Sequence, residues 1–450
     1  MQRERNEAVV TLELTADSRS VHQTHLVPII MKFLKSSAAL LLALAAAQAA
    51  SAQTTIRITG STAFRSATIG SIQSLLASGY DVAFNGTAAS SSNYSTFVGT
   101  YSGSPVVIQC AWSGSVDGIR DVTQNLNQTF IKASVVANTT AGTDSTASVS
   151  TSTAANVEQG VPDIAMADNT QTATPYRTPA LTEIRVAVQP FVFVKGRVGA
   201  SHPGKAGFDG INNITSQLAK LLLNGGVPLS FFTGAADASD TKIYALGRNP
   251  LSGTRVVTFA ETGYGSTTTA TQFKPVISGT TITGVNIYPA GSGFVDGNNG
   301  YSSGGTLAGE LANTVVDTNG SGNLYDGQPF GFIGYVGIGD AGALLKAINT
   351  TVGTDVSYVL AYNGQSLPAT YNNVAQTTSW DFSPIIQGKY SLWSYEYLSY
   401  LPTLSGLPKT FADALAANIA ANVPASAGIK LSDLTASGVQ RASEGAVITK

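Results

Sequence analysis

From residue 53 onward, short hydrophobic runs alternate with amphipathic stretches. TTIRITG (54–60) alternates hydrophobic and polar positions with a period of two, which predicts a strand. STAFRSATIGSIQSLLAS (61–78) follows with the period of a helix. The same order recurs in SPVVIQCAW (104–112), a predicted strand, and SVDGIRDVTQNL (115–126), a predicted helix. Strands that alternate with helices predict an α/β architecture with parallel sheets.

The second half of the pattern contains longer buried elements and two polar interruptions. Further strands are predicted at 161–168, 186–196 and 241–247, and a helix at 211–225 that ends at Gly225. Residues 138–156 are rich in Ser, Thr and Ala, which predicts an exposed loop. Residues 264–305 are rich in Gly, Thr and Asn, and the β-branched alternation inside them predicts an added hairpin over 273–289.

The segment that begins at Met31 has the composition of a signal peptide. Lys32 and Lys35 precede an apolar run over 38–49, and Ala50-Ser51-Ala52 fits a cleavage site before Gln53. The apolar run is shorter than the roughly 20 residues that span a bilayer. We therefore expect a signal peptide over 31–52, a natural start at Met31, a periplasmic or secreted protein, and no membrane span after cleavage. Gln53, and not a cysteine, stands directly after the cleavage site, so no lipid anchor is expected there.

Composition narrows the classes of function. The 450 residues suffice for two ordinary domains, with 43% hydrophobic residues, 12% charged residues and a net charge of −2. The chain has no Lys/Arg cluster, so nucleic acid is not an expected partner. We predict that Cys110, the one cysteine of the sequence, is a buried strand residue. Only His202 follows the signal segment, which disfavours a catalytic triad or a histidine-rich metal site.

Four turns carry residues suited to an anion, each at the carboxyl end of a predicted strand. Helix N-termini at such turns offer unpaired N–H groups and a partial positive charge, hydroxyls add donors, and an arginine adds a charged fork. In open α/β sheets, ligands bind at this edge. The turns are Gly60-Ser61-Thr62-Ala63, Ser113-Gly114-Ser115, Ala167-Asp168, and Arg248 with Ser252-Gly253-Thr254. Taken singly, each turn is more often an ordinary helix cap.

Taken in order, the four turns resemble the phosphate-binding proteins of bacterial phosphate ABC importers, within the type II periplasmic binding protein superfamily. TGSTAFRSA (59–67) resembles the family's first loop, Gly114-Ser115-Val116-Asp117-Gly118 its second, and Asp163 to Asp168 its third. Arg248 to Thr254 matches its R-x-x-x-S-G-T. PFGFIGYVGIG (329–339) and YSLWSYEYLSYL (390–401) resemble two later strands. The family's acidic residue between the arginine and the SGT is absent, since Asn249-Pro250-Leu251 stand there.

The resemblance implies two α/β lobes joined by a two-strand hinge, with the ligand in the cleft between them. The expected limits are 53–189 for the first part of lobe I, 190–335 for lobe II, and 336–450 for the return to lobe I with C-terminal helices. It implies a monomeric, non-enzymatic solute-binding protein that delivers inorganic phosphate to an ABC permease without a cofactor or metal. The expected phosphate ligands are Ser61, Thr62, Ala63, Ser115, Asp168, Arg248, Ser252, Gly253 and Thr254.

Asp168 has a chemical reason to stand in an anion site. Phosphate near neutral pH carries a proton that a carboxylate can accept, whereas sulfate has none to give. A buried acceptor left unpaired against sulfate is expected to reject it by roughly 10⁴-fold.

Several alternatives stay open from the residues alone. The ligand could be another tetrahedral oxyanion, arsenate included, or the chain could be a surface or matrix protein that kept the fold without transport. An exported phosphate-ester hydrolase is disfavoured by the missing histidines. Gly337 to Gly342 spells the dinucleotide fingerprint G-x-G-x-x-G, and 317–328 resembles a calcium loop with Gln328 in the place of the usual Glu. We read both segments as ordinary turns.

Overall fold

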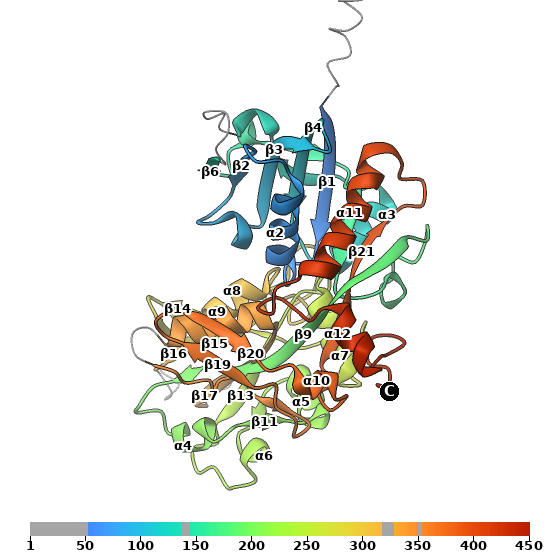
Figure 1. Ribbon diagram of the computed structural model, residues 1–450. Helices are drawn as coiled ribbons and strands as arrows, with labels where there is room; N and C mark the ends of the chain where they lie inside the picture. The colour runs from blue at the N-terminus through green and yellow to red at the C-terminus, as the bar shows by residue number, and fades with distance from the viewer. Residues whose placement is uncertain (1–52, 137–144, 317–327, 350–352) are drawn as a thin grey trace, which may run out of the picture. The chain divides into compact units, whose positions relative to one another are not determined.

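The computed structural model describes residues 53–136, 145–316, 328–349 and 353–450 (Figure 1). Residues 53–450 form one compact unit. The predicted signal peptide lies outside the described residues, as do residues 137–144 of the Ser/Thr-rich loop and all of the calcium-like segment except Gln328. No helix in the described part of the chain is both long and apolar enough to cross a membrane.

One sheet of eleven strands runs through the described chain. Its order is β12-β13-β17-β9-β21-β8-β1-β4-β3-β2-β6. In that order the bounds are Val227–Pro228, Lys242–Leu246, Phe330–Gly337, Thr182–Lys195, Trp393–Tyr400, Ile164–Ala167, Thr54–Gly60, Ser104–Ala111, Tyr94–Tyr101, Asp81–Phe84 and Ser145–Ser148. The predicted strands at 54–60, 104–112, 161–168, 186–196 and 241–247 are confirmed. β2, β3, β6 and β12 were not predicted, and β6 lies within the stretch over 138–156 that was predicted to be an exposed loop.

The sheet is mixed, so the prediction of parallel sheets was right only in part. β1 is parallel to β4 and β8, and β13 is parallel to β17. β3 and β4 form an antiparallel hairpin whose two turn residues, Ser102 and Gly103, have φ of 48° and 80°. Positive φ at both positions is the requirement of a type I′ turn, which matches the twist of the strands. β9 and β21 are antiparallel to each other.

Two hydrophobic cores lie on either side of the β9–β21 pair. The first core takes buried residues from 56 to 166, then Val186 and Ala187, then residues from 398 to 427. The second core takes residues from 188 to 397, with three more at 429, 434 and 439. β9 therefore passes from the first core to the second between residues 187 and 188, and β21 returns between 397 and 398.

These cores correspond to two α/β lobes joined by two neighbouring strands, as the fold prediction stated. The predicted forward crossing at 190 lies within β9. The predicted return from residue 336 does not coincide with the cores, because Ile338 and Leu344 lie in the second core. They belong to α9 (Ile338–Ile348), which packs against β9 and β17 in that half of the sheet.

Helices cover both halves of the sheet (Figure 1). α2 (Arg65–Leu75), α3 (Ser115–Gln124) and α11 (Gly406–Asn422) pack with the first core. α5 (Ser216–Asn224), α7 (Gly253–Glu261), α8 (Gly304–Leu311) and α9 pack with the second. The remaining short helices are α4 (Lys205–Asp209), α6 (Ser230–Thr233), α10 (Ser383–Ile386) and α12 (Leu431–Ser437).

Small sheets hold the inserted segments. The predicted hairpin over 273–289 is confirmed as β14 (Phe273–Ser278) paired with β15 (Thr281–Ile287). β16 (Thr314–Val315) and β10 (Arg197–Val198) extend it. The other two-stranded sheets are β11 (Asn213–Ile214) with β18 (Ala361–Tyr362), β19 (Ala369–Asn372) with β20 (Thr377–Trp380), and β5 (Gln128–Ile131) with β7 (Val157–Gly160).

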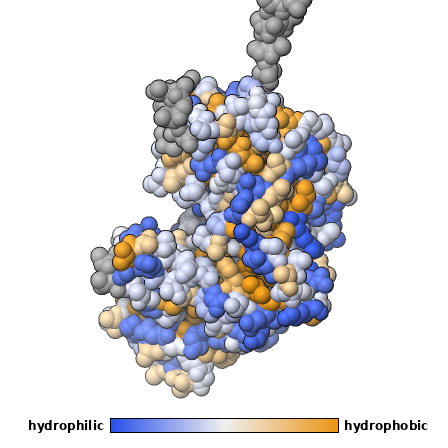
Figure 2. Space-filling model, in the orientation of Figure 1, coloured by the Kyte–Doolittle hydropathy of each residue, from blue (hydrophilic) through white to orange (hydrophobic). Residues whose placement is uncertain are grey.

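Cys110, His202 and the G-x-G-x-x-G segment, for which the sequence predicted no catalytic or cofactor-binding role, have structural roles. Cys110 is fully buried in β4. His202 is buried, with Nε2 3.0 Å from the Phe330 carbonyl and Nδ1 accepting from Gly204 N–H at 3.1 Å. Gly339 and Gly342 of the G-x-G-x-x-G segment lie inside α9 and not in a phosphate-binding loop. On the face in Figure 2, hydrophobic residues form small groups scattered among hydrophilic ones.

Candidate functional site

The predicted ligand residues come together at the ends of four strands. Thr62 follows β1, Ser115 follows β4 and Asp168 follows β8, and these three strands are parallel neighbours whose carboxyl ends meet at one edge. Arg248 and Thr254 follow β13 in the other half of the sheet. All five side chains are at most 4% exposed. We call them the Arg248 cluster.

Arg248 links the two halves of the molecule. Its Nη2 donates to Thr62 Oγ1 at 3.0 Å and to the Ser302 carbonyl at 2.8 Å, and its Nε donates to the Tyr301 carbonyl at 3.1 Å. Nη1 makes only a long contact of 3.4 Å, with Thr254 Oγ1. One of the two Nη1 N–H groups therefore has no partner among the described residues. The guanidinium keeps a charged donor to offer inside the cluster.

The backbone of Arg248 is held on both sides by side chains distant in sequence. Its N–H donates to Tyr335 Oη at 3.1 Å, and its carbonyl accepts from Gln272 Nε2 at 3.0 Å. Tyr335 Oη also donates to Gln272 Oε1 at 2.7 Å, which closes the network. A Cβ at Gly247 would lie 1.6 Å from Gln272 Oε1, so only glycine fits before the arginine. This network fixes the backbone from which the guanidinium reaches the cluster.

Asp168 is the carboxylate of the cluster. Ser115 Oγ donates a short hydrogen bond to its Oδ1, and Thr254 Oγ1 donates to its Oδ2 at 3.3 Å. Burial raises the pKa of Asp168, while the Ser115 hydroxyl and the charge of Arg248 oppose that rise. A Cβ at Gly253 would lie 1.6 Å from Asp168 Oδ1. The glycine of the S-G-T motif is thus required for the carboxylate to reach the first turn of α7.

Helix N-termini supply further donors to the same place. The N–H groups of Ala63, Ser115, Gly253 and Thr254 make no hydrogen bond within the described residues. These residues stand at or just before the first turns of α2, α3 and α7. Unpaired N–H groups at helix starts attract anions, and here three such starts meet beside an arginine.

Two predicted ligands have visible capping contacts. Ser252 is the N-cap of α7, and its Oγ accepts from Arg255 N–H at 3.4 Å. Ser61 Oγ accepts from Phe64 N–H at 3.3 Å near the start of α2. Of the two hydroxyls of the first loop, Thr62 contacts Arg248, whereas Ser61 caps its own turn and also acts on the carboxyl group of Glu396 in β21. Each capping hydroxyl still has a hydrogen to donate.

A backbone contact joins the two halves beside the cluster. The Leu251 carbonyl accepts from Val116 N–H at 3.0 Å and from Asp117 N–H at 3.3 Å at the start of α3. A Cβ at Gly114 would lie 2.6 Å from that carbonyl oxygen, and Gly114 has a φ of 125°. Glycine is thus needed here for conformation and for the close approach. Asp117, on the same turn, forms an ion pair of 2.5 Å with Arg120.

The structure adds two charged residues to the cluster that sequence reasoning missed. Asp340, on the first turn of α9, acts electrostatically on both Arg248 and Arg65 and opposes the burial that lowers the pKa of each arginine. Arg65, at the start of α2, donates to Asn93 Oδ1 at 2.8 Å. α9 thus brings an acidic charge near Arg248, although none follows the arginine in Asn249-Pro250-Leu251. Asp340 lies within the G-x-G-x-x-G segment that we had read as a turn.

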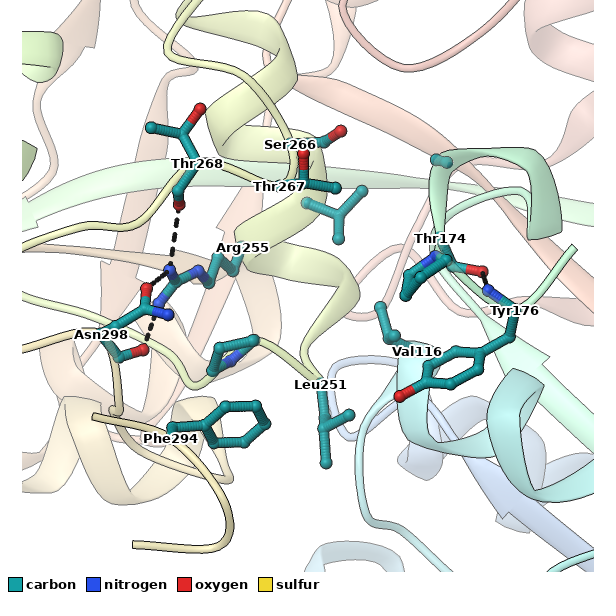
Figure 3. Close-up of a pocket in the computed structure, with 14 residues that line it drawn as sticks. Val116, Thr174, Tyr176, Leu251, Arg255, Ser266, Thr267, Thr268, Phe294 and Asn298 are labelled. Carbon is teal, nitrogen blue, oxygen red and sulfur yellow. Dashed lines mark hydrogen bonds between the residues drawn. The ribbon is translucent and has the colours of Figure 1, made fainter. Parts of the chain in front are cut away.

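A pocket of about 200 Å³ lies next to the cluster and not within it (Figure 3). Val116, Thr174 and Tyr176 line one side, and Leu251 and Arg255 belong to the other. None of the predicted ligands lines it. The hydroxyls of Ser266, Thr267 and Thr268 also border the pocket.

Comparisons with known proteins give weak likeness only. No protein-family model matches the chain, and no curated protein matches it. Among solved structures, an ABC-type phosphate transport receptor from Vibrio cholerae has a TM-score of 0.37 and 13% identity, and the match covers 80% of this chain and 93% of that one. A phosphate-binding protein from Stenotrophomonas maltophilia has a TM-score of 0.34 and 12% identity, over 86% and 90%. An OxyR variant from Corynebacterium glutamicum has a TM-score of 0.33 and 10% identity, over 92% and 77%. At these values the likeness concerns the arrangement of elements alone.

Proposed function

We propose that the protein is an exported solute-binding protein that holds one inorganic phosphate ion in the Arg248 cluster. The observation that carries the proposal is the convergence of three kinds of group in one buried place. Arg248 brings a charge with an N–H to spare, Gly253 and Thr254 bring unpaired backbone N–H groups, and Asp168 brings a proton acceptor. A tetrahedral oxyanion that carries a proton matches all three.

The contacts between the two halves suit a ligand that closes a hinge. Thr62, Ser115 and Asp168 follow strands that belong to the first core, whereas Arg248 and Thr254 follow β13 in the second. An ion bound by both sets is released when the lobes separate about β9 and β21. Each hydrogen bond to a charged group contributes about 1.5–3 kcal/mol net. Part of this set therefore suffices for a Kd of about 1 μM, which corresponds to about −8 kcal/mol.

Asp168 makes phosphate the preferred anion over sulfate. Its Oδ1 and Oδ2 already accept from Ser115 and Thr254, and each carboxylate oxygen has a second lone pair for the phosphate O–H. Sulfate presents only acceptors to this carboxylate. Arsenate has the charge and protonation of phosphate, so the same groups bind it.

The role in transport belongs to the same proposal. We propose that the protein is monomeric, lies in the periplasm or outside the cell, and delivers phosphate unchanged to an ABC permease. The predicted signal peptide at 31–52 and the resemblance of the four loops to the family support this role. Arg248, Ser115 and Thr254 act here as ligands and not as catalytic groups.

Isothermal titration calorimetry tests the proposal directly. Purified protein is stripped of bound ligand by mild unfolding and refolding, then titrated with phosphate, arsenate and sulfate in separate runs. We expect Kd values of about 1 μM or below for phosphate, a comparable value for arsenate, and no measurable heat from sulfate. Absence of heat from every oxyanion, in protein with native circular dichroism, would contradict the proposal.

A further inference from the structure

Glu396 is a charged residue in the middle of a buried aromatic strand. It lies in β21 between Tyr395 and Tyr397 and is fully buried. Neither of its carboxyl oxygens meets the full geometry of a hydrogen bond within the described residues, and the Ser61 hydroxyl is the one group that acts on it as a hydrogen-bond donor. An ionised carboxylate without a partner is costly to bury, whereas a protonated one is tolerated. The surroundings of Glu396 therefore favour its neutral form.

The strand register places Glu396 beside the carboxylate of the Arg248 cluster. Tyr397 and Ala167 are the last pair of the antiparallel β21–β8 ladder, and Glu396 and Asp168 are the next residues beyond that pair on the two segments. On its other side β21 pairs with β9, and the register shifts between Glu396 and Tyr397. The unpaired residue at this shift is Val186 of β9, and no residue of β21 is left out of the pairing there.

The two carboxyl groups have opposite surroundings. Asp168 accepts from two hydroxyls and lies in the field of Arg248. Around Glu396, the described groups that act on its charge are Asp168 and the Ser61 hydroxyl, with no arginine or lysine among them. Burial, and then the charge of Asp168, raise the pKa of Glu396 well above its usual value, and Ser61 opposes them. A pair of this kind gives up its protons in two coupled steps.

We propose that Glu396 and Asp168 form a carboxyl pair that holds one proton, with the proton on Glu396. Glu396 is then a positioning residue for the anion site. Its neutral form allows Asp168 to stay ionised, and ionised Asp168 accepts the proton of the bound oxyanion. When Glu396 ionises, a second negative charge stands behind Asp168 and repels the anion. Binding is thereby coupled to pH through a residue that does not touch the ligand.

The effect on binding rests on the proposed phosphate site, but the proton on Glu396 does not. The first test therefore needs no ligand. Infrared spectroscopy across pH 5 to 9 follows the carbonyl stretch of a buried protonated carboxyl group in the wild type and in Glu396→Gln, Asp168→Asn and Glu158→Gln. Glu158 is a partly exposed glutamate on β7, so its variant serves as the matched control.

We expect a band in the wild type that persists at neutral pH, remains in Glu158→Gln and is missing from Glu396→Gln. In Asp168→Asn the band should disappear at a lower pH than in the wild type, because the neighbouring negative charge is gone. A wild type without the band at pH 7 would overturn the proposal. An unshifted midpoint in folded Asp168→Asn would equally overturn it.

The second test measures phosphate affinity over the same pH range. The Kd of the wild type divided by that of Glu396→Gln should be near one at low pH and rise, up to about tenfold per pH unit, above the midpoint of the infrared band. The ionisation of phosphate itself changes both Kd values by the same factor, so it cancels in the ratio. A flat ratio would refute the role of Glu396 in binding. If neither protein binds phosphate while the infrared results hold, the proposed function fails and the carboxyl pair stands.

Discussion

Arg248 and Arg255 lie seven residues apart, and both are buried to within 3% exposure, yet their surroundings differ. Arg255 donates through Nη1 to the carbonyls of Arg248 at 3.0 Å and Asn298 at 2.9 Å, and through Nη2 to Thr268 at 3.4 Å and the Asn298 side chain. It also lies 4.5 Å from the centre of the Phe259 ring. Arg248 donates to a hydroxyl from the other half of the molecule and keeps an N–H to spare.

The difference shows that a buried charged side chain does not by itself indicate a ligand-binding site. Neither arginine has a carboxylate within ion-pairing distance among the described residues. Arg255 is satisfied by the loops it ties together, which is the pattern of a structural residue. Arg248 is only partly satisfied, next to unpaired N–H groups and a carboxylate, which is the pattern of a ligand-binding residue.

The largest effect on anion binding is expected at Asp168, because Arg248 has this carboxylate near it and Arg255 has none among the described residues. In Asp168→Asn, the amide can donate to sulfate, so sulfate gains affinity while phosphate loses some. The preference for phosphate should fall by about 10³-fold or more, which is about 4 kcal/mol. Calorimetry with both anions measures it. Selectivity equal to that of the wild type would remove the proton-accepting role from Asp168.

Removal of the Arg248 charge should have the second-largest effect on phosphate binding. Arg248→Met deletes the one unpaired guanidinium N–H that can reach the ion, together with its charge, so the Kd for phosphate should rise by up to about 10²-fold, or about 3 kcal/mol. The variant also leaves the Ser302 carbonyl without its donor and the Tyr301 carbonyl with the Asn249 N–H alone, so its folding must be checked by circular dichroism. A folded variant that binds phosphate like the wild type would show that Arg248 is structural after all.

The matched variant Arg255→Met should lose more stability and less phosphate affinity than Arg248→Met. Four oxygens lose a donor, and two of them, the Asn298 and Thr268 backbone carbonyls, have no other donor among the described residues, so the free energy of unfolding should fall by about 3 kcal/mol. Denaturant unfolding measures the loss. Phosphate affinity of the folded fraction should change by less than about threefold, under 1 kcal/mol. If affinity falls as far as in Arg248→Met, the two arginines are not distinct in role.

The smallest effect is expected at Ser252, which caps α7 between the two arginines. Ser252→Ala should lower the free energy of unfolding by about 1 kcal/mol through loss of the cap. Its free hydroxyl hydrogen is a predicted phosphate donor, so the Kd should also rise by about tenfold. Ser252→Thr should restore both quantities in large part. An unchanged Kd in Ser252→Ala would leave the residue with its capping role alone.

The sequence predicted the elements that place the cluster because each has a local pattern. β1 was predicted residue for residue. The predicted end of α5 at Gly225 is right to within one residue, whereas its predicted start at 211 was wrong, because α5 begins at Ser216 and residues 213–214 form β11. The return of the chain to the first core was placed too early, since the pattern of α9 does not say which core its hydrophobic face joins. Packing on β9 decides that, and β9 lies more than a hundred positions away in the sequence.

The candidate site was predictable only where a motif is continuous in sequence. Ser115, Asp168 and Arg248 follow predicted strands, so their meeting could be inferred from the order of the strands. Asp340 and Tyr335 reach Arg248 from α9 and β17, and no local signal connects them. Glu396 did carry a signal that was passed over, because a carboxylate inside a strand of buried aromatic residues is rare without a role.

A crystal structure of the protein with phosphate tests the central claim most directly, because it separates the Arg248 cluster from the neighbouring pocket. We predict one ion in contact with Arg248 Nη1, the N–H groups of Gly253 and Thr254, and the carboxylate of Asp168. An ion seated instead in the pocket beside Arg255 and Tyr176, with the cluster unchanged, would contradict it.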